Sequence, residues 1–149
     1  MQKRIFCRIY MALTICCTAC GHSDLGKSQA EVAAKEFAEA YFNYDFGKAA
    51  QYATDNSRKW IEFKASNIGE DDIAILREQE NGATVEITDA DQYDENNATV
   101  SLRISNFLET DTLGGKGHVV DEASINLHLQ LTTEGKWKVR MEGPLRSGK

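Results

Sequence analysis

Residues 111–118, Asp-Thr-Leu-Gly-Gly-Lys-Gly-His, are the first segment whose residue types could do chemistry. Glycine amides beside a lysine can cradle a phosphate, but a phosphate-binding P-loop requires GxxxxGK[ST] leading into a helix. Here no Ser or Thr follows Lys116, and the next residues alternate as in a strand. We therefore interpret the run as a long flexible hairpin loop.

Two acidic runs suggest metal sites by composition only. An EF-hand loop needs Asp or Asn at positions one, three and five and Gly at six. In the run that begins at Asp89, Tyr93 and Asp94 take the fifth and sixth positions, so we expect a turn between strands. Residues 70–72, Glu-Asp-Asp, suit the first turn of a helix, where acidic side chains oppose the helix dipole. The sequence predicts neither a metal nor a cofactor.

The histidines and cysteines do not form a recognisable reactive group. His22, His118 and His128 are far apart, and no pair has the HxxxH spacing of metal ligands. All four cysteines lie in the first twenty residues, which leaves the rest without a disulfide or a thiol nucleophile. A GxSxG elbow is also missing from the sequence. Hydrolysis by a nucleophile or a metal therefore lacks support, and catalytic residues are not predicted.

Residues 1–20 have the pattern of an export signal. Three cations and no acid precede an apolar stretch from Ile9 to Ala19, which is too short to span a bilayer. The small residues Thr18 and Ala19 then precede Cys20, as in a lipobox, whose cysteine is lipidated and becomes the mature N-terminus. Cys17 stands where the usual pattern has leucine, so cleavage by ordinary signal peptidase, giving a secreted or periplasmic protein, stays an alternative.

The residues after Cys20 are expected to form a tether and one domain. Residues 21–27 are short and polar and suit a tether, and residues 28–149 suit a single domain. Gly21 offers no acidic inner-membrane retention signal, which favours the outer membrane, facing the periplasm or the cell surface. Beyond residue 20 the chain has 14 Lys and Arg against 23 Asp and Glu, a net charge of −9. Such a charge argues against nucleic-acid binding.

Helical periodicity dominates the first half of the domain. Ser28 and Glu31 form a capping box, which predicts a helix start at Ser28. Asp45 is the expected N-cap of a second helix, whose pattern breaks at residues 54–57 and resumes from Arg58 to Ser66. A further short helix is expected from Glu70 to about Gln79.

From Ala83 the period changes from helical to alternating. Four strands are expected, each with one apolar and one polar face, which is typical of an antiparallel sheet covered on one side. Residues 133–135, Thr-Glu-Gly, supply the hairpin between the last two strands. Helices followed by a meander of strands predict an α+β domain, with two or three N-terminal helices packed on one face of a curved four-stranded antiparallel sheet.

Two motifs connect this order of elements to a known superfamily. Residues 40–46, Ala-Tyr-Phe-Asn-Tyr-Asp-Phe, and residues 135–139, Gly-Lys-Trp-Lys-Val, resemble the nuclear-transport-factor-2-like (cystatin-like) superfamily. More narrowly, the chain resembles small bacterial lipoproteins of that superfamily, most of them of unknown function. The resemblance covers about residues 28–145 and implies a cone between helices and sheet, whose open end the tryptophan of the second motif plugs.

The cone suggests a pocket and two rival functions. Its expected edge is aromatic: Tyr41, Trp60, Phe63, Phe107 and Trp137. The leading hypothesis is a non-catalytic envelope protein, attached to the membrane through Cys20, that binds a small apolar ligand or another envelope protein. The rival is an isomerase or dehydratase of the kind seen among relatives. It needs an acid and a base inside the cone, a condition that a buried Asp89 or Tyr93 would meet.

The outer face of the expected sheet is the last candidate surface. Arg103, His128, Lys138 and Arg140 fall on it, in a domain that is otherwise acidic. A solvated strand face, in which cations prevent stray strand pairing, is the plain interpretation. The functional one is an interface, because members of the resembled superfamily often dimerise through this face. A purely structural dimerisation module is therefore a third hypothesis, which predicts a filled cone and a homodimer.

Overall fold

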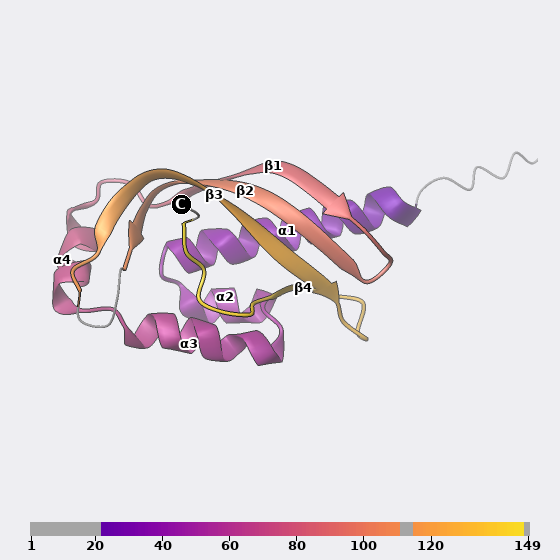
Figure 1. Cartoon of the computed structure of the whole chain (residues 1–149), viewed down its shortest axis with the longest axis horizontal. Coiled ribbons are helices and arrows are strands. Elements are labelled where there is room, and N and C mark those ends of the chain that lie inside the picture. The colour runs from indigo at the N-terminus through magenta and orange to yellow at the C-terminus, as the bar shows by residue number, and fades with distance from the viewer. Residues whose placement is uncertain (1–21, 111–114, 148–149) are drawn as a thin grey trace, which may run out of the picture.

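The protein folds as helices on one side of a curved sheet (Figure 1), as expected from the sequence. The computed structural model describes residues 22–110 and 115–147, and for residues 22–28 the backbone alone. Cys20, the signal segment and residues 111–114 of the glycine-rich run lie outside these residues. The helices are α1 (His22–Phe42), α2 (Phe46–Tyr52), α3 (Arg58–Ser66) and α4 (Glu70–Glu78), with a 3-10 turn, η1, at Asp55–Ser57. The strands are β1 (Thr84–Gln92), β2 (Asn97–Glu109), β3 (His118–Leu131) and β4 (Trp137–Arg140).

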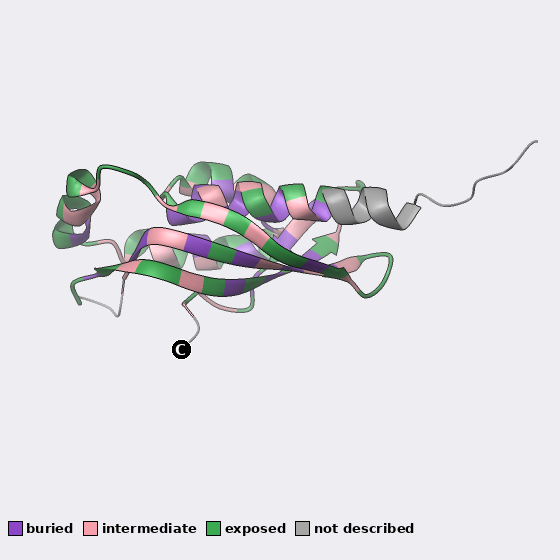
Figure 2. Cartoon of the chain, turned by 90° about the horizontal axis from the view of Figure 1, so that it is seen from above, coloured by how far each residue is buried: buried purple, intermediate pink, exposed green. Residues whose placement is uncertain are grey.

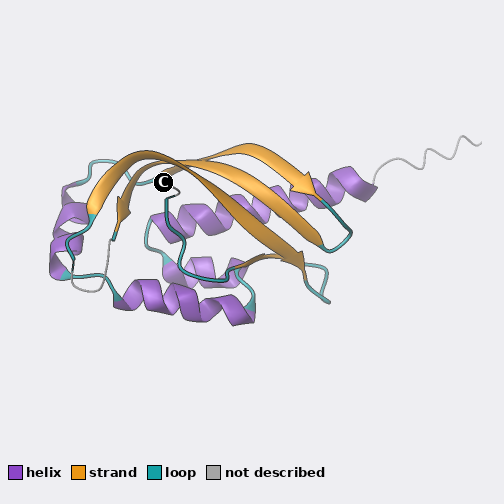
Figure 3. Ribbon diagram, viewed as in Figure 1, coloured by secondary structure: helices purple, strands orange, loops and turns teal. Residues whose placement is uncertain are grey.

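The sheet is an antiparallel meander in the order β1-β2-β3-β4. Helix α1 lies across it and contacts all four strands, while α2 and α3 continue the helical layer and α4 lies at one end (Figures 1 and 3). Burial alternates along β2 and β3, as Figure 2 shows, because successive side chains point to opposite faces. The α+β architecture predicted from periodicity is therefore confirmed.

The first helix differs from its expected bounds. It begins at His22, six residues before Ser28, so Ser28 lies within the helix and is not its N-cap. The backbone of residues 22–27, expected as a tether, is helical as well. Residues such as Leu25 and Lys27 are good helix formers, so the periodic pattern can extend toward the N-terminus past a capping signal.

The other helix boundaries agree with the sequence. Asp45 caps α2, because its Oδ1 accepts a hydrogen bond of 3.0 Å from the Lys48 amide. Helix α3 has the predicted bounds, and α4 ends one residue before the predicted end.

Just after the C-terminal end of α1, the Asn43 side chain contacts the backbone of Ala83. Its Oδ1 accepts a hydrogen bond of 2.9 Å from the Ala83 amide, and its Nδ2 donates one of 3.0 Å to the Ala83 carbonyl. This close approach requires glycine at position 82, where a Cβ would lie 2.2 Å from Asn43 Oδ1.

A bulge in β1 decides which of its residues face the helices. The register against β2 shifts between Ile87 and Asp89, leaving Thr88 as the extra residue. Val85 and Ile87 pack against the core before the bulge, and Ala90 is buried after it. Asp89, which would otherwise follow Ile87 on the inward face, is exposed.

Candidate functional site

A groove of about 360 Å³ lies at the edge of the helical layer, beside the last strand. One wall is the middle of α1, with Gln29, Val32 and Ala33. The C-terminal end of α2, residues 51–52, and the β3–β4 hairpin, residues 135–138, complete it. Its volume falls within the roughly 300–1,000 Å³ of small-molecule sites.

The hairpin wall is held by a tight turn. The Thr132 amide donates to the Lys136 carbonyl at 2.9 Å, and the Gly135 amide donates to the Thr132 carbonyl at the same distance. Gly135 has φ of 75°, a left-handed conformation that favours glycine. The turn places Trp137, the first residue of β4, against the core with almost no exposure. The groove is thus built on fixed backbone and a buried indole.

The charge of the groove is opposite to that of the protein. Its lining includes Lys136 and Lys138, and no carboxylate is among the described residues that line it. Lys136 forms an ion pair of 3.5 Å with Glu134, but both side chains are largely exposed, so the pair contributes little. The side-chain amides of Gln29 and Gln51 add neutral hydrogen-bonding groups.

The five aromatic residues predicted to edge a pocket do not come together. Tyr41 and Phe107 are buried in the core, each in edge-to-face contact with Phe42. Trp137 lines the groove. Trp60 is half-buried on α3, and Phe63 is 41% exposed on the same helix. Of the predicted set, only Trp137 is among the residues that line this groove.

Aromatic rings and aliphatic side chains pack against one another between α1 and the sheet. Phe37 stacks on Tyr41 with a centroid distance of 5.5 Å, and Phe46 meets the same ring edge-on at 6.0 Å. The inward residues of β2 and β3 that face them, such as Leu102 and Leu127, are fully buried. These rings and aliphatic side chains belong to one hydrophobic core cluster.

Tyr41 is a buried ionisable residue near the C-terminal end of α1, with 1% exposure. Burial raises the pKa of its hydroxyl to about 12, and the nearby Leu145 backbone opposes this shift. That backbone is not placed for a well-formed hydrogen bond, so the hydroxyl has no partner among the described residues. The two residues that would have supplied an acid or base to the cone, Asp89 and Tyr93, are both exposed.

Asp72 is a buried carboxylate with a structural role. It is 1% exposed, and its two oxygens accept hydrogen bonds from the Gly117 amide at 2.8 Å and the Gly69 amide at 2.9 Å. The side chain thereby caps α4 and joins it to the residues before β3. A Cβ on residue 117 would lie 2.7 Å from Asp72 Oδ1, so glycine is needed there for the approach.

Tyr44 and Lys64 lie near this carboxylate. The Tyr44 hydroxyl donates to the Leu108 carbonyl at 2.7 Å, and burial, followed by the nearby Asp72 charge, raises its pKa well above the ordinary value. Lys64 donates to Thr110 Oγ1 at 2.7 Å, and burial lowers its pKa although acidic neighbours oppose the shift. Each of these polar atoms has an internal partner, which is typical of a structural cluster.

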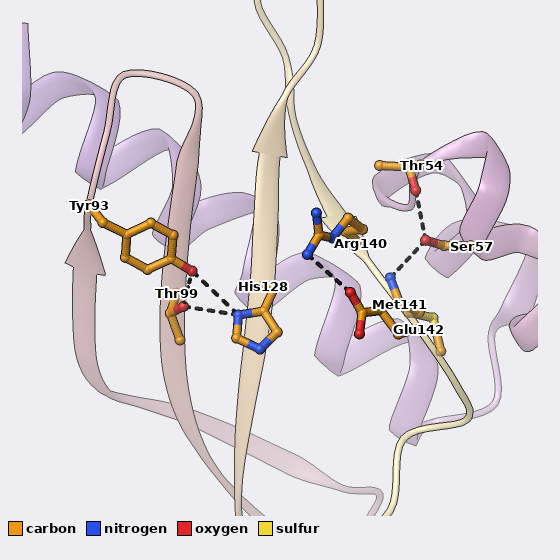
Figure 4. A network of polar contacts seen from close by, with 8 residues as sticks. All are labelled: Thr54, Ser57, Tyr93, Thr99, His128, Arg140, Met141 and Glu142. Atoms are coloured by element: carbon orange, nitrogen blue, oxygen red, sulfur yellow. Dashed lines mark hydrogen bonds and ion pairs between the residues drawn. The ribbon is translucent and has the colours of Figure 1, made fainter.

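The outer sheet face brings together part of the predicted interface. Arg103 contacts Glu86 at 2.9 Å and Glu122 at 3.5 Å, so its charge is balanced within the chain. Arg140 pairs with Glu142 at 3.1 Å and stands opposite His128 in the β3–β4 register (Figure 4).

The remaining members of that face have different surroundings. The Nδ1 atom of His128 lies 3.0 Å from Thr99 Oγ1, which also bonds the Tyr93 hydroxyl (Figure 4). Lys138 is half-buried and lines the groove described above. Whether this face forms an interface stays a prediction.

Metal-binding clusters and membrane-spanning helices are both absent from the part of the chain that the structure describes. Within residues 22–110 and 115–147, no three His, Cys, Asp or Glu side chains are grouped so that they could hold a metal ion. Among the helices that the structure describes, none has both the length and the apolar character needed to cross a membrane.

The comparisons with known proteins concern the fold. A ketosteroid isomerase-like protein from Erwinia carotovora atroseptica is 18% identical with a TM-score of 0.44, over 76% of this chain and 91% of that one. An Ntf2 like protein involved in plasmid conjugation is 16% identical with a TM-score of 0.42, over 83% of this chain and 52% of that one. Likeness at this level carries no argument about function. No protein-family model and no curated protein matches the chain.

Sequence reasoning missed most of the groove. Gln29, Val32, Gln51 and Tyr52 were not singled out, although Trp137 and Lys138 were. Val32 does not belong to the apolar stripe of α1 and is 58% exposed in the structure. Because single exposed apolar residues are common on protein surfaces, the sequence carried little signal for this groove.

Proposed function

We propose that the protein is a non-catalytic binding protein of the cell envelope, exported and anchored by a lipid on Cys20, that takes a small apolar ligand in the groove beside Trp137. The observation that carries the binding function is the groove itself. It combines an apolar wall, a fixed hairpin and a volume of about 360 Å³ at an open edge of the fold. Sites of this kind hold ligands mainly through apolar contact, with a few polar groups for orientation.

The rival enzymatic function has less support. An isomerase or dehydratase requires an acid and a base that both reach the substrate. The bulge in β1 turns Asp89 outward, and Tyr93 contacts Thr99 on the outer face of the sheet. Tyr41 is surrounded by aromatic rings, and Asp72 is engaged by two backbone amides. Neither Tyr41 nor Asp72 is among the described residues that line the groove.

Binding of N-phenyl-1-naphthylamine, a neutral apolar dye, tests the groove. We expect saturable binding with enhanced dye fluorescence, because the dye would leave water for the apolar wall. Val32→Glu places a charge in the groove and should weaken binding at least tenfold. Ile73→Glu is the matched control: Ile73 is also helical and 40% exposed, but lies on α4 outside the groove. Absent saturable binding, or equal loss in both variants, would overturn the proposal.

The lipid anchor is supported by the sequence around Cys20 and needs a separate test. The mature protein from membranes should carry a diacyl or triacyl mass on Cys20, and Cys20→Ser should release the protein into the soluble fraction. Cys17→Ser is the control, because residue 17 precedes the modified cysteine and would be removed with the signal. An unmodified chain in the soluble fraction would refute the lipid anchor and indicate a secreted or periplasmic protein.

The destination and the partners follow from the same proposal. Gly21 after the cysteine favours the outer membrane over retention in the inner membrane. A homodimer through the sheet face, or a contact with another envelope protein, would use His128 and Arg140, whose side chains are exposed. Sedimentation of the purified protein, with His128→Glu as the variant, tests the dimer, because a buried interface would not accept an added charge.

A further inference from the structure

The groove is a basic site on an acidic protein. The whole chain carries a net charge of −6, yet the charged residues that line the groove are the two lysines of the hairpin, Lys136 and Lys138. Carboxylates outnumber cations elsewhere, so a lining with two cations and no described carboxylate is the opposite of the average surface. Lys136 also pairs with Glu134 at 3.5 Å, but both side chains are largely exposed and such a pair is weak. The local charge therefore still attracts an anionic group even when the protein as a whole repels it.

The apolar part of the groove lies next to these cations. Trp137 stands between the two lysines in sequence and is buried, while Val32 and Ala33 form the facing wall on α1. Tyr52 adds a half-buried aromatic ring from α2. A ligand that fills the groove therefore meets apolar surface along one part and cationic side chains along another.

We propose that the groove selects a single-chain amphiphile with an anionic head group. The apolar chain lies against Val32 and Trp137, and the head group is held by Lys136 and Lys138. A volume of about 360 Å³ is at the small end for ligand sites, which suits one chain and not two. This inference rests on the proposed binding function and adds the charge of the ligand to it.

Displacement of N-phenyl-1-naphthylamine by three twelve-carbon competitors tests the inference. Laurate carries a carboxylate, dodecanol is neutral and dodecyltrimethylammonium is cationic, so the three compounds differ at the head group. We expect laurate to displace the dye at a concentration about tenfold below that of dodecanol, and the cationic compound to be the weakest. High salt should reduce the advantage of laurate, because the lysines are accessible to solvent.

Charge-removing variants show whether the lysines cause the preference. The double variant Lys136→Gln and Lys138→Gln should weaken displacement by laurate about tenfold and leave dodecanol unchanged. The control pair is Lys35→Gln and Lys59→Gln, which removes the same charge from exposed positions outside the groove. Unchanged thermal melting of both pairs checks that folding is intact.

The outcomes separate the two proposals. If the dye binds and dodecanol displaces it as well as laurate, the binding function stands and the charge preference is refuted. If the dye does not bind at all, the binding function itself fails. Dodecyl phosphate in place of laurate compares the two anionic head groups, and displacement by either supports the inference. Binding to phosphatidylglycerol vesicles that is lost in the groove double variant, with no displacement by laurate, would refute it in favour of a membrane contact.

Discussion

Ser57 joins two distant parts of the chain through its buried hydroxyl. The side chain has no exposure, and its Oγ accepts a hydrogen bond of 2.8 Å from the Met141 amide just beyond β4. The Ser57 hydroxyl also forms a hydrogen bond with the Thr54 hydroxyl, with the two Oγ atoms 2.7 Å apart (Figure 4). The Thr54 amide in turn donates to the Val139 carbonyl at 2.9 Å. We call the contacts of Thr54 and Ser57 with Val139 and Met141 the clasp.

Ser57→Ala is expected to destabilise the protein by about 2 kcal/mol. The change leaves the Met141 amide buried without an acceptor, which costs about 1–3 kcal/mol, and it also removes the bond to Thr54. Serine and alanine are close in size, so a cavity contributes little. At roughly 3–4 °C per kcal/mol for a domain of this size, the midpoint of thermal unfolding should fall by about 6–8 °C.

Two variants isolate this effect. Thr54→Ala removes one partner of the hydroxyl but leaves the acceptor of the Met141 amide in place, so about 0.5–1 kcal/mol is expected. Ser66→Ala removes an exposed serine that bonds a helix carbonyl, and should change stability by less than about 0.5 kcal/mol. Circular dichroism melts and urea titrations measure all three. The reasoning is refuted if Ser57→Ala melts within about 2 °C of the wild type, or if Thr54→Ala is equally destabilising.

Three further predictions concern ionisable groups. The hydroxyl of Tyr41 has a pKa raised to about 12 in the folded state against about 10 when unfolded, so its stabilising contribution is complete below pH 10 and is lost as the pH rises through 12. In Tyr41→Phe, the pH midpoint of alkaline unfolding, followed by tyrosinate absorbance, should therefore move upward. An unchanged midpoint would contradict this. Asp72→Asn should lower the free energy of unfolding by about 1–3 kcal/mol, because an amide nitrogen replaces one of the two oxygens that face backbone N–H groups. Hydrogen exchange of the Gly117 amide should accelerate. Exchange at the wild-type rate would show that the bond from Gly117 to Asp72 is dispensable. Arg103→Ala should change stability by less than about 1 kcal/mol, since its ion pairs are exposed, and a larger loss in urea titration would show that the pairs act as a network.

The arrangement of elements was predictable because periodicity is a local property. Alternation over residues 98–104 and 123–131 indicated which faces of β2 and β3 are buried, and the structure confirms it. The Asp45 cap and the bounds of α3 also follow from neighbouring residues. The predicted start of α1 was wrong, because the capping-box pattern at Ser28 can also occur inside a helix that begins earlier.

The candidate site was less predictable because it depends on tertiary packing. Periodicity could not show the bulge at Thr88, which turns Asp89 outward and buries Ala90. The aromatic set was chosen by residue type, yet Tyr41 and Phe107 pack into the core while Phe63 faces solvent. The groove combines residues from α1, α2 and the β3–β4 hairpin, and a single sequence does not show that these segments meet.

The clasp also constrains the order in which the fold can be completed. Its Ser57–Met141 bond joins residues 84 positions apart, so this contact of the helical layer with the sheet cannot form until β4 and Met141 have been synthesised. Before β4 arrives, the outer edge of β3 has unpaired backbone groups along residues 128–131. An open edge of this kind can pair with a second chain. A chain truncated before Trp137 would also lose the buried side chains of Trp137, Val139 and Met141, so it should be less stable and more prone to aggregate. The short strand β4 thus protects the edge of β3 against self-association.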